Sequence, residues 1–521
     1  MRIPFIPAAV RPAQARAWAG VSLSGVLLAS CAVGPDFVSP GGPLVHGYTR
    51  EQRAAATAAV ETAGGSSQGF ETGRDIPGAW WALFRSRQLN AFVEEAIRNH
   101  PDVQAAQFAL RYARENALAQ QGGLFPQISG SASAERDRVS TSQSGQWPAQ
   151  ASTYTLYNAS VSVSYALDIW GGTRRSVEAL QAQADYQGFK LEATYLALTA
   201  NVVTAAITDA SLRDQILATE EIIKAETDQL TRIQRQFGIG AISRSDVLSQ
   251  EATLAQAKAT LAPLQKQLAQ QRNQLMAYLG RLPSQDRGEH LRLADLRLPG
   301  RLPLSLPSSL VRQRPDIRQA EATLHQATAT VGVGIANLLP QLTLSGSYGS
   351  TAPERLFSPE TIVWSAASSV SQKIFDGGTL YHTKEADVAA FEQDLALYKS
   401  TVVTAFQNVA DSLRAIQYDA ATLKAQAAAE KATADSLAMA IEQFKTGAVP
   451  YANIINAQQS YLNSRVSRVK AQATRFTDTA ALFQALGGGW WNRMDETPDA
   501  LPRASAGYFA GVDKKTEDAL R

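Results

Sequence analysis

Apolar residues along the chain recur with two characteristic spacings, and both spacings occur in each half. In four stretches they step by three and four residues, the heptad pattern of helices that pack as coiled coils. The stretches with this spacing are 191–237, 247–278, 391–423 and 455–483. We therefore expect a long helix from Gly172 to Gln236, roughly 100 Å at 1.5 Å per residue, and a second from Thr379 to Lys445. Each is followed by a shorter returning helix.

Polar residues interrupt the first heptad seam where the spacing calls for apolar ones. These exceptions are Asp209, Thr219 and Glu226. The helix that returns after Gly240 contains Pro263, which lacks a backbone N–H and clashes with the preceding turn. We therefore expect a kink or a break at Pro263.

Strict alternation of apolar and polar residues predicts strands. The clearest runs from Tyr157 to Leu167, where apolar side chains alternate with Asn158 and three serines. Other strands are expected after Pro126, over Leu342 to Ser350 and over Ile362 to Phe375. One apolar face and one small polar face suit a barrel wall between lipid and a wet lumen. An ordinary half-buried sheet shows the same alternation.

These segments occur twice in the same order. His100 to Ala134 matches Arg314 to Ser350, about 214 residues later, and both read as a proline-led helix, a proline exit and a strand. The turn FGIGAISRSDVLSQ matches FKTGAVPYANIINA, about 207 residues later. The order indicates a tandem duplication, with repeats at 79–300 and 301–490 that each hold two strands and two long helices.

The N-terminal end of the sequence resembles an export signal, and the C-terminal end resembles a poorly ordered tail. Residues 1–30 combine a basic leader with an apolar run of about a dozen residues, as in a signal peptide. Leu28 to Cys31 resembles a bacterial lipobox, in which Cys31 would carry N-acyl and S-diacylglycerol chains as a membrane anchor. The alternative is an ordinary signal peptide with a chance cysteine. Residues 31–78 are expected to be a lipidated N-terminal linker, and 491–521 a poorly ordered tail.

Composition excludes several function classes. The formal net charge is +2, and Lys and Arg are scattered, so there is no electrostatic case for nucleic acid. The five histidines are far apart, and no HxxxH or CxxC spacing occurs, which gives no support for a metal site. Cys31 is the only cysteine, so an intrachain disulfide is impossible. No cofactor is expected.

Four strands in one chain have a consequence for assembly. They cannot close a barrel, and open sheet edges are not tolerated in lipid, so the chain must oligomerise if these strands cross a membrane. The long helices are too charged and too rich in Gln to lie in hydrocarbon. We therefore expect a mainly α protein with membrane β, in which a barrel is continued by a tunnel of helices standing in water.

Seven short motifs are distributed along the chain. They are CAVGPDF at 31–37, WWALF at 80–84, NHPDVQAA at 99–106, LDIWGGTRRSVEA at 167–179, RQRPDIRQAEATL at 312–324, FDGG at 375–378 and LFQALGGGW at 482–490. Together they resemble the motifs of the TolC-type outer-membrane efflux channels, in the lipoprotein branch that includes the OprM and NodT proteins. Each is a weak cap or turn signal alone. They cover nearly the whole chain after residue 31 in the family's order.

The resemblance implies a homotrimer with a twelve-stranded β-barrel in the Gram-negative outer membrane and an α-barrel of twelve helices in the periplasm. Each protomer would be anchored through Cys31, with Ala32 permitting sorting to that membrane. The resemblance also implies a periplasmic adaptor and an inner-membrane pump of the RND type. The duct itself would be passive, would catalyse no reaction, and would let small toxic molecules such as drugs leave the cell.

The resemblance places the adaptor contact and the gate at the two helix turns. The residues assigned to the contact are Phe237, Gly240, Ala241, Ser243, Asp246, Phe444, Gly447, Tyr451 and Asn453. The gate is assigned to Ala448, Val449 and Pro450. Many relatives carry acidic residues at the second turn, whereas this chain does not, so an apolar collar at Val449 is our hypothesis. Simple turn chemistry, with Gly just after a helix end, explains the same residues without a partner.

Three other functions fit parts of the pattern. The exit duct of a type I protein-secretion system would have the same fold. A lipid-anchored periplasmic coiled-coil scaffold would explain the helices but would not need the alternation from Tyr157 to Leu167. An enzyme is disfavoured because no GxSxG elbow, P-loop or metal motif stands in a suitable context.

Overall fold

The computed structural model describes residues 32–493, apart from 44, 46, 52–54 and 140–151. The described residues form two compact units, each built from both halves of the chain. The first, called here the sheet unit, comprises 32–40, 110–187 and 319–399. The second, the hairpin unit, comprises 41–109, 188–318 and 400–493. The expected signal peptide, Cys31 and all but the start of the expected tail lie outside the described residues.

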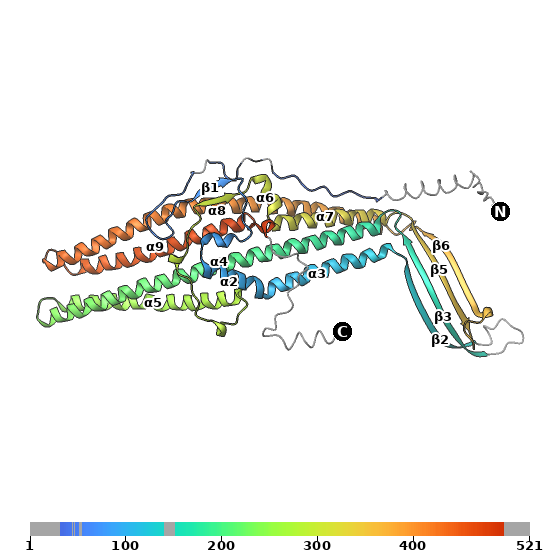
Figure 1. The fold of residues 1–521 in the computed structure, drawn as a ribbon, viewed down its shortest axis with the longest axis horizontal. Helices are drawn as coiled ribbons and strands as arrows, with labels where there is room; N and C mark the ends of the chain where they lie inside the picture. Colours follow the sequence, from blue (N-terminus) through green and yellow to red (C-terminus); the bar gives the residue numbers. More distant parts are fainter. Residues whose placement is uncertain (1–31, 44, 46, 52–54, 140–151, 494–521) are drawn as a thin grey trace, which may run out of the picture. The chain divides into compact units, whose positions relative to one another are not determined.

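Four antiparallel strands make up the sheet, in the order β2-β3-β5-β6 (Figure 1). They are β2 (Gln127–Val139), β3 (Ser152–Leu167), β5 (Gln341–Ala352) and β6 (Ile362–Ser371). All four predicted strands are confirmed, although β6 ends before Phe375. The register places Ser129, Ser162, Ser347 and Ser365 in one row across the sheet. Because neighbouring positions point to opposite faces, this register separates serines from apolar residues.

A proline-led helix precedes the first strand of each half. These helices are α3 (Pro101–Gln121) and α7 (Pro315–Ala336), each with an aspartate in its first turn. Proline suits the first helical position because its missing N–H would have no partner there. Pro126 and Pro340 then stand between helix and strand, as the sequence predicts.

Two helices of equal length dominate the chain. They are α4 (Gly172–Gly238) and α8 (Thr379–Lys445), of 67 residues each. Their returning partners are α5 (Arg244–Tyr278) and α9 (Ala452–Ala485), and Figure 1 shows the two hairpins that they form in the hairpin unit. Many heptad residues predicted to face inward are buried, among them Val202, Ile233, Leu254, Val409 and Phe476, whereas Phe237 at the end of the first seam is 41% exposed. One 18-residue stretch of α4 is apolar enough for a membrane span, but half of it is buried within the chain, as in the core helix of a soluble protein.

The break expected at Pro263 is absent, since α5 continues through that residue. Pro263 and its neighbour Ala262 are exposed, and so is Ala259, whose carbonyl loses its helical partner to the proline ring. Water can satisfy a carbonyl on the solvent side of a helix. Of the kink or break expected at Pro263, the break is therefore contradicted, because the proline lies on the outer face.

The expected N-terminal linker is more ordered than its composition suggests. Within it, β1 (Gly69–Thr72) pairs in parallel with β4 (Arg301–Leu304). Neither strand was predicted, and β4 lies in the proline-rich connection between the two halves of the chain. The buried Arg475 of α9 donates to the carbonyls of Gly64 and Ser66 and to the side chain of Gln68. This stretch is followed by η1 (Trp80–Phe84) and α2 (Arg87–Asn99), and the connection between the halves ends in α6 (Pro307–Gln313). Part of the stretch 31–78, expected to be a linker, is therefore held against β4 and α9.

Candidate functional site

The turn of the first hairpin is built by a glycine and a capping box. After α4 ends at Gly238, Gly240 has φ +75°, and the amide of Ala241 donates to the carbonyl of Gln236 at 2.9 Å. Ser243 then caps α5: its hydroxyl accepts from the amide of Asp246 at 3.2 Å, and the Asp246 carboxylate accepts from the amide of Ser243 at 3.2 Å. Both orphan amides are satisfied, which fixes where the returning helix starts.

The second turn repeats this geometry. Gly447 has φ +74°, and the amide of Ala448 donates to the carbonyl of Gln443 at 2.9 Å. Ala448 and Pro450 are exposed and Val449 is half-buried. In both turns a left-handed glycine follows the last helical turn, so the backbone alone explains why glycine stands at Gly240 and Gly447.

An apolar cluster joins the two hairpins close to their turns. Its buried members are Ile233, Val247, Ala440, Tyr451 and Ile454. Tyr451 is 2% exposed, and its ring meets the edge of Phe444 with 5.3 Å between centroids. The side chain of Tyr451 therefore packs inside the chain and is not available to a partner, unlike the expectation from the sequence.

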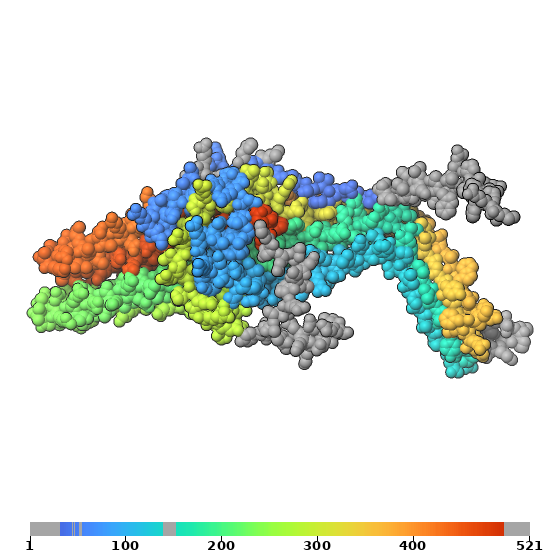
Figure 2. All heavy atoms as spheres, in the orientation of Figure 1, coloured from blue at the N-terminus to red at the C-terminus, as the bar shows by residue number. Residues whose placement is uncertain are grey.

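Exposed residues at the first turn are apolar and basic. Ile239 is 81% exposed, and the Arg244 guanidinium lies 6.0 Å from the centre of the Phe237 ring. The ends of both hairpins are uncovered on the face shown in Figure 2. Of the predicted contact residues, Gly240, Ala241, Ser243, Gly447 and Asn453 are thus open to solvent.

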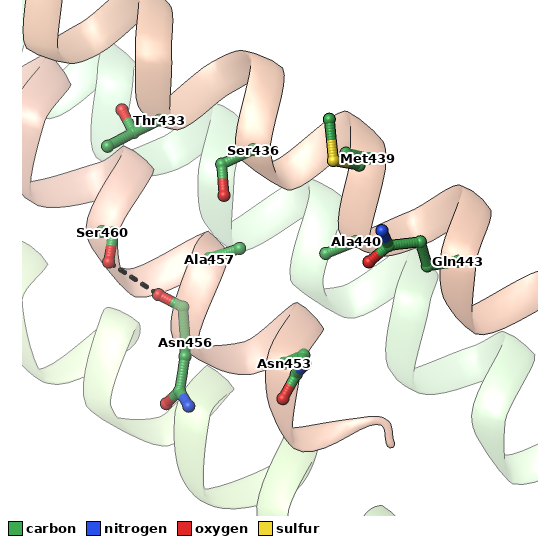
Figure 3. Close-up of a pocket in the computed structure, with 9 residues that line it drawn as sticks. All are labelled: Thr433, Ser436, Met439, Ala440, Gln443, Asn453, Asn456, Ala457 and Ser460. Carbon is green, nitrogen blue, oxygen red and sulfur yellow. Dashed lines mark hydrogen bonds between the residues drawn. The ribbon is translucent and has the colours of Figure 1, made fainter. Parts of the chain in front are cut away.

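A groove of about 470 Å³ lies between α8 and α9 near their turn (Figure 3). Its lining residues are Thr433, Ser436, Met439, Ala440, Gln443, Asn453, Asn456, Ala457 and Ser460. Hydroxyl and amide groups predominate, with Met439 as the one large apolar side chain. Such a surface can accept hydrogen bonds and side-chain packing from another polypeptide. In the described part of the chain, no group of three or more His, Cys, Asp or Glu residues could hold a metal ion.

The sheet has two chemically distinct faces. One row on the first face is Gly130, Val161, Tyr348 and Trp364. The adjacent row on the opposite face is the serine row, in which Ser129 bonds to Ser162 and Ser347 to Ser365, each at 2.8 Å. Val161, Tyr348 and Trp364 are more than half exposed. A sheet that leaves aromatic and branched side chains uncovered on one face is suited to a lipid environment on that side.

Residues 33–39 pack against α4 and α7 through a set of contacts that the sequence did not predict. The Arg175 guanidinium donates to the Asp36 carboxylate at 2.6 Å, to the Glu178 carboxylate at 2.7 Å and to the carbonyls of Val33 and Gly34. These partners raise the pKa of Arg175 although burial opposes the shift.

Aromatic and steric contacts complete this docked segment. The Phe37 ring stacks on His325 at 4.3 Å between centroids, and His325 bonds to Glu178 at 2.9 Å. A side chain at Gly34 would approach the α carbon of Gly332 to 2.5 Å, so the two backbones meet at glycines. Asp36 and Arg175 lie in two of the motifs named above, but no spacing rule connects residues so far apart in sequence.

Comparison with known proteins identifies the family. The profile described as "Outer membrane efflux protein" matches residues 92–281 and 306–488. The chain is 26% identical over 491 residues to the probable efflux pump outer membrane protein TtgC of Pseudomonas putida KT2440, covering 93% of this chain and 97% of TtgC. It is 27% identical over 471 residues to nodulation protein T of Rhizobium leguminosarum bv. viciae, covering 89% and 92%.

Solved structures agree in fold. The outer-membrane channel OprN superposes with a TM-score of 0.79 at 24% identity, covering 88% of this chain and all of that one. The Campylobacter jejuni CmeC channel superposes with a TM-score of 0.78 at 19% identity, covering 94% and 100%. The chain belongs to the outer membrane efflux protein family, and its fold is that of the TolC-like outer-membrane channels.

Proposed function

We propose that this protein is the passive exit duct of a tripartite efflux pump in the outer membrane. The observation that carries the proposal is the four-stranded sheet, with an apolar face, a serine face and two open edges, in a chain that also forms long water-exposed helical hairpins. Relatives are named for efflux of toluene and antibiotics and for export of pyoverdine. The cargo class is accordingly small molecules, and the family is one of channels rather than enzymes.

The unpaired edges of the sheet support the proposal that the protein is a trimer. Among the described residues, strands β2 and β6 each pair on one side only. In lipid, every backbone N–H and C=O must find a partner, and edge strands satisfy this only in a closed barrel. Three copies would join β2 of one protomer to β6 of the next and close a barrel of twelve strands. The serine row would then line the lumen.

The lipid anchor is proposed from the sequence and from the docked segment. Acyl chains on Cys31 would add about 0.8 kcal/mol per buried CH₂ to membrane binding. Residues 33–39, immediately after that cysteine, are fixed by Arg175 and Phe37. Acyl labelling that persists in Cys31→Ser would contradict this assignment.

The hairpin turns are proposed as the site that meets a periplasmic adaptor, through which an inner-membrane RND-type pump delivers its cargo. The exposed turn residues and the adjacent groove offer backbone, hydroxyl and amide groups together with Ile239 and Met439 as apolar contacts. Cross-linking from Ser243→Cys or Thr446→Cys should capture an adaptor and its pump. Recovery of a secretion adaptor would point instead to protein export, and no capture would favour a scaffold.

The gate is proposed at Val449, flanked by Ala448 and Pro450. An apolar collar blocks the passage of ions because a narrow apolar constriction dewets. Val449→Asp should make resting channels leakier or selective for cations in planar bilayers. Unchanged conductance would place the constriction elsewhere.

A pair of substitutions on opposite faces of β3 tests the duct itself. Lysine on a lipid-facing strand position costs about 2–4 kcal/mol at the bilayer centre, whereas lumen positions tolerate charge. Val161→Lys should therefore reduce assembled channels in the membrane, while Ser162→Lys should assemble normally and alter ion selectivity. Equal assembly of both variants, or no bilayer conductance from the wild type, would refute the proposal.

A further inference from the structure

Glu226 is an acid at a position that the heptad pattern reserves for an apolar residue. It stands on α4, one heptad before Ile233, and is 1% exposed. The other two polar exceptions in this seam have partners for their charge or hydroxyl. Asp209 is ion-paired, since its Oδ2 accepts from Arg213 at 2.9 Å and its Oδ1, which has no hydrogen bond within the described residues, lies 4.0 Å from Nε of Arg272. Thr219 donates to the Gln215 carbonyl at 2.8 Å. Within the described residues, the Oε2 atom of Glu226 has no hydrogen-bond partner.

This acid lies where the two hairpins meet. Gln250 of α5 donates through Nε2 to the backbone carbonyl of Glu226 at 3.2 Å. Tyr451, at the start of α9, donates its hydroxyl to the Gln250 side chain at 2.7 Å. A single chain of hydrogen bonds thus connects α4, α5 and the second hairpin beside an otherwise apolar cluster.

The charges around Glu226 do not compensate its own. Burial alone raises its pKa to about 7 from an ordinary value of 4.5. Burial is the main cause that raises the pKa of the Tyr451 hydroxyl, at the N-cap of α9, and the acidic Glu226 and Asp246 raise it further. From α8 the apolar cluster receives Ala440 and Leu437, and no charged group contributes to the pKa shift of Glu226. An ionised Glu226 would therefore be a buried charge without a counterion, which a packed junction does not tolerate.

We propose that Glu226 is a proton-controlled lock between the two helical hairpins. When protonated, it lets Tyr451 and Ile454 of the second hairpin pack against α4 and α5. When it releases its proton to water, the charge must be hydrated, and the hairpins separate. Only the last step rests on the proposed function: separation of the hairpins would widen the periplasmic end of the duct.

The direction of the pH effect follows from linkage. In the separated state water solvates the carboxyl, and its pKa falls back toward 4.5. A group whose pKa is higher in the packed state favours packing fully below 4.5 and loses that effect as the pH rises through about 7. For this difference, the ratio of separated to packed hairpins should rise about 70-fold between pH 5 and pH 8.

Distances between the hairpins test the lock without reference to transport. Spin labels at Gln256→Cys on α5 and Ser460→Cys on α9, both exposed positions, would be measured in the full-length protein in lipid nanodiscs. Protein without the added cysteines gives the background from Cys31. The wild type should show one narrow distance at pH 5 and a growing longer one as the pH passes about 7.

Variants separate this inference from a merely structural role. Glu226→Gln should keep the short distance at every pH, and Asp228→Asn, an exposed acid on the same helix, should behave as the wild type. If Glu226→Gln does not fold, Glu226→Met fills the site without charge and should also stay closed. A Glu226→Gln protein with the wild-type pH response, or a wild type whose distance is constant from pH 5 to pH 8, overturns the lock.

Bilayer conductance on the same samples distinguishes the two proposals. Conductance that rises with pH in the wild type but not in Glu226→Gln supports both. A pH-dependent distance without any conductance refutes the duct and leaves the lock intact. Conductance that ignores pH while the distance changes refutes the final step of the inference.

Discussion

Removing the Arg175 side chain should release residues 33–39 from the sheet unit. This guanidinium is only 6% exposed, and four acceptors surround it. In Arg175→Ala the Glu178 carboxylate and the carbonyls of Val33 and Gly34 lose their donor. The segment would keep the stacking of Phe37 on His325 and the hydrogen bonds from the Val33 amide to the Trp170 carbonyl and from the Ser39 hydroxyl to the Glu321 carboxylate.

The magnitude depends on which of the four contacts is shielded from water. Asp36 is 89% exposed, so its ion pair contributes no more than about 1 kcal/mol despite the 2.6 Å distance. Hydrogen bonds between a buried charged group and its partners contribute about 1.5–3 kcal/mol each. We expect Arg175→Ala to weaken docking by about 3 kcal/mol and Asp36→Asn by about 0.5 kcal/mol.

Hydrogen exchange of the Val33 amide measures this difference directly. That amide donates to the Trp170 carbonyl at 2.9 Å, so it exchanges only when the segment opens. A loss of about 3 kcal/mol corresponds to roughly 150-fold faster exchange, against about twofold for Asp36→Asn. Amides in the middle of α4 serve as the internal control and should not change.

Two results would contradict the reasoning. If Asp36→Asn accelerates exchange as much as Arg175→Ala, the exposed ion pair dominates and burial is the wrong criterion. If neither substitution alters exchange, Phe37 and the backbone contact at Gly34 hold the segment without Arg175.

Three further predictions concern the hairpins. Ser243→Ala should cost about 1 kcal/mol and speed exchange at the start of α5, whereas Ser245→Ala should not, because only Ser243 caps the helix. Gly240→Ala should lower the melting temperature because φ is +75° there, whereas Gly238→Ala, inside the helix with open space around it, should raise it by the equivalent of about 0.5–1 kcal/mol. Burial, reinforced by Asp478, raises the pKa of Asp419 to about 7, so the protonated form that the folded state favours is lost as the pH rises through that value. Asp419→Asn should therefore raise the melting temperature at pH 8 and have little effect at pH 4. An equal effect at both pH values would contradict the direction of this pKa shift.

Elements with a strong repeat were predictable from the sequence. Strand β3 and helix α4 follow their alternating and heptad patterns over many residues, so the predicted ends lie within five positions of the observed ones. By contrast, β1 and β4 have four residues each and pair across about 230 positions. A strand that short carries no measurable alternation, and only its distant partner stabilises it.

Side-chain roles at the turns were harder to assign than the turns themselves. Tyr451 follows a glycine turn, which made it look like a contact residue, yet it is buried. The heptad spacing does predict that Tyr451 is buried, because positions 451, 455, 458 and 462 continue the steps of four and three residues along α9. For Glu226 the sequence identified the right position, because an acid there interrupts the heptad pattern. The lack of a counterion could be recognised only from the packing.

The equal length of α4 and α8, 67 residues each, restricts how this protein can change in size. A heptad seam tolerates insertions or deletions only in whole sevens, since any other number rotates the apolar stripe away from its partner. A hairpin also needs the same change in its returning arm. Length variants should therefore be viable only when all four helices gain or lose a heptad together, which makes the reach of the hairpins a quantity that varies in steps of about 10 Å.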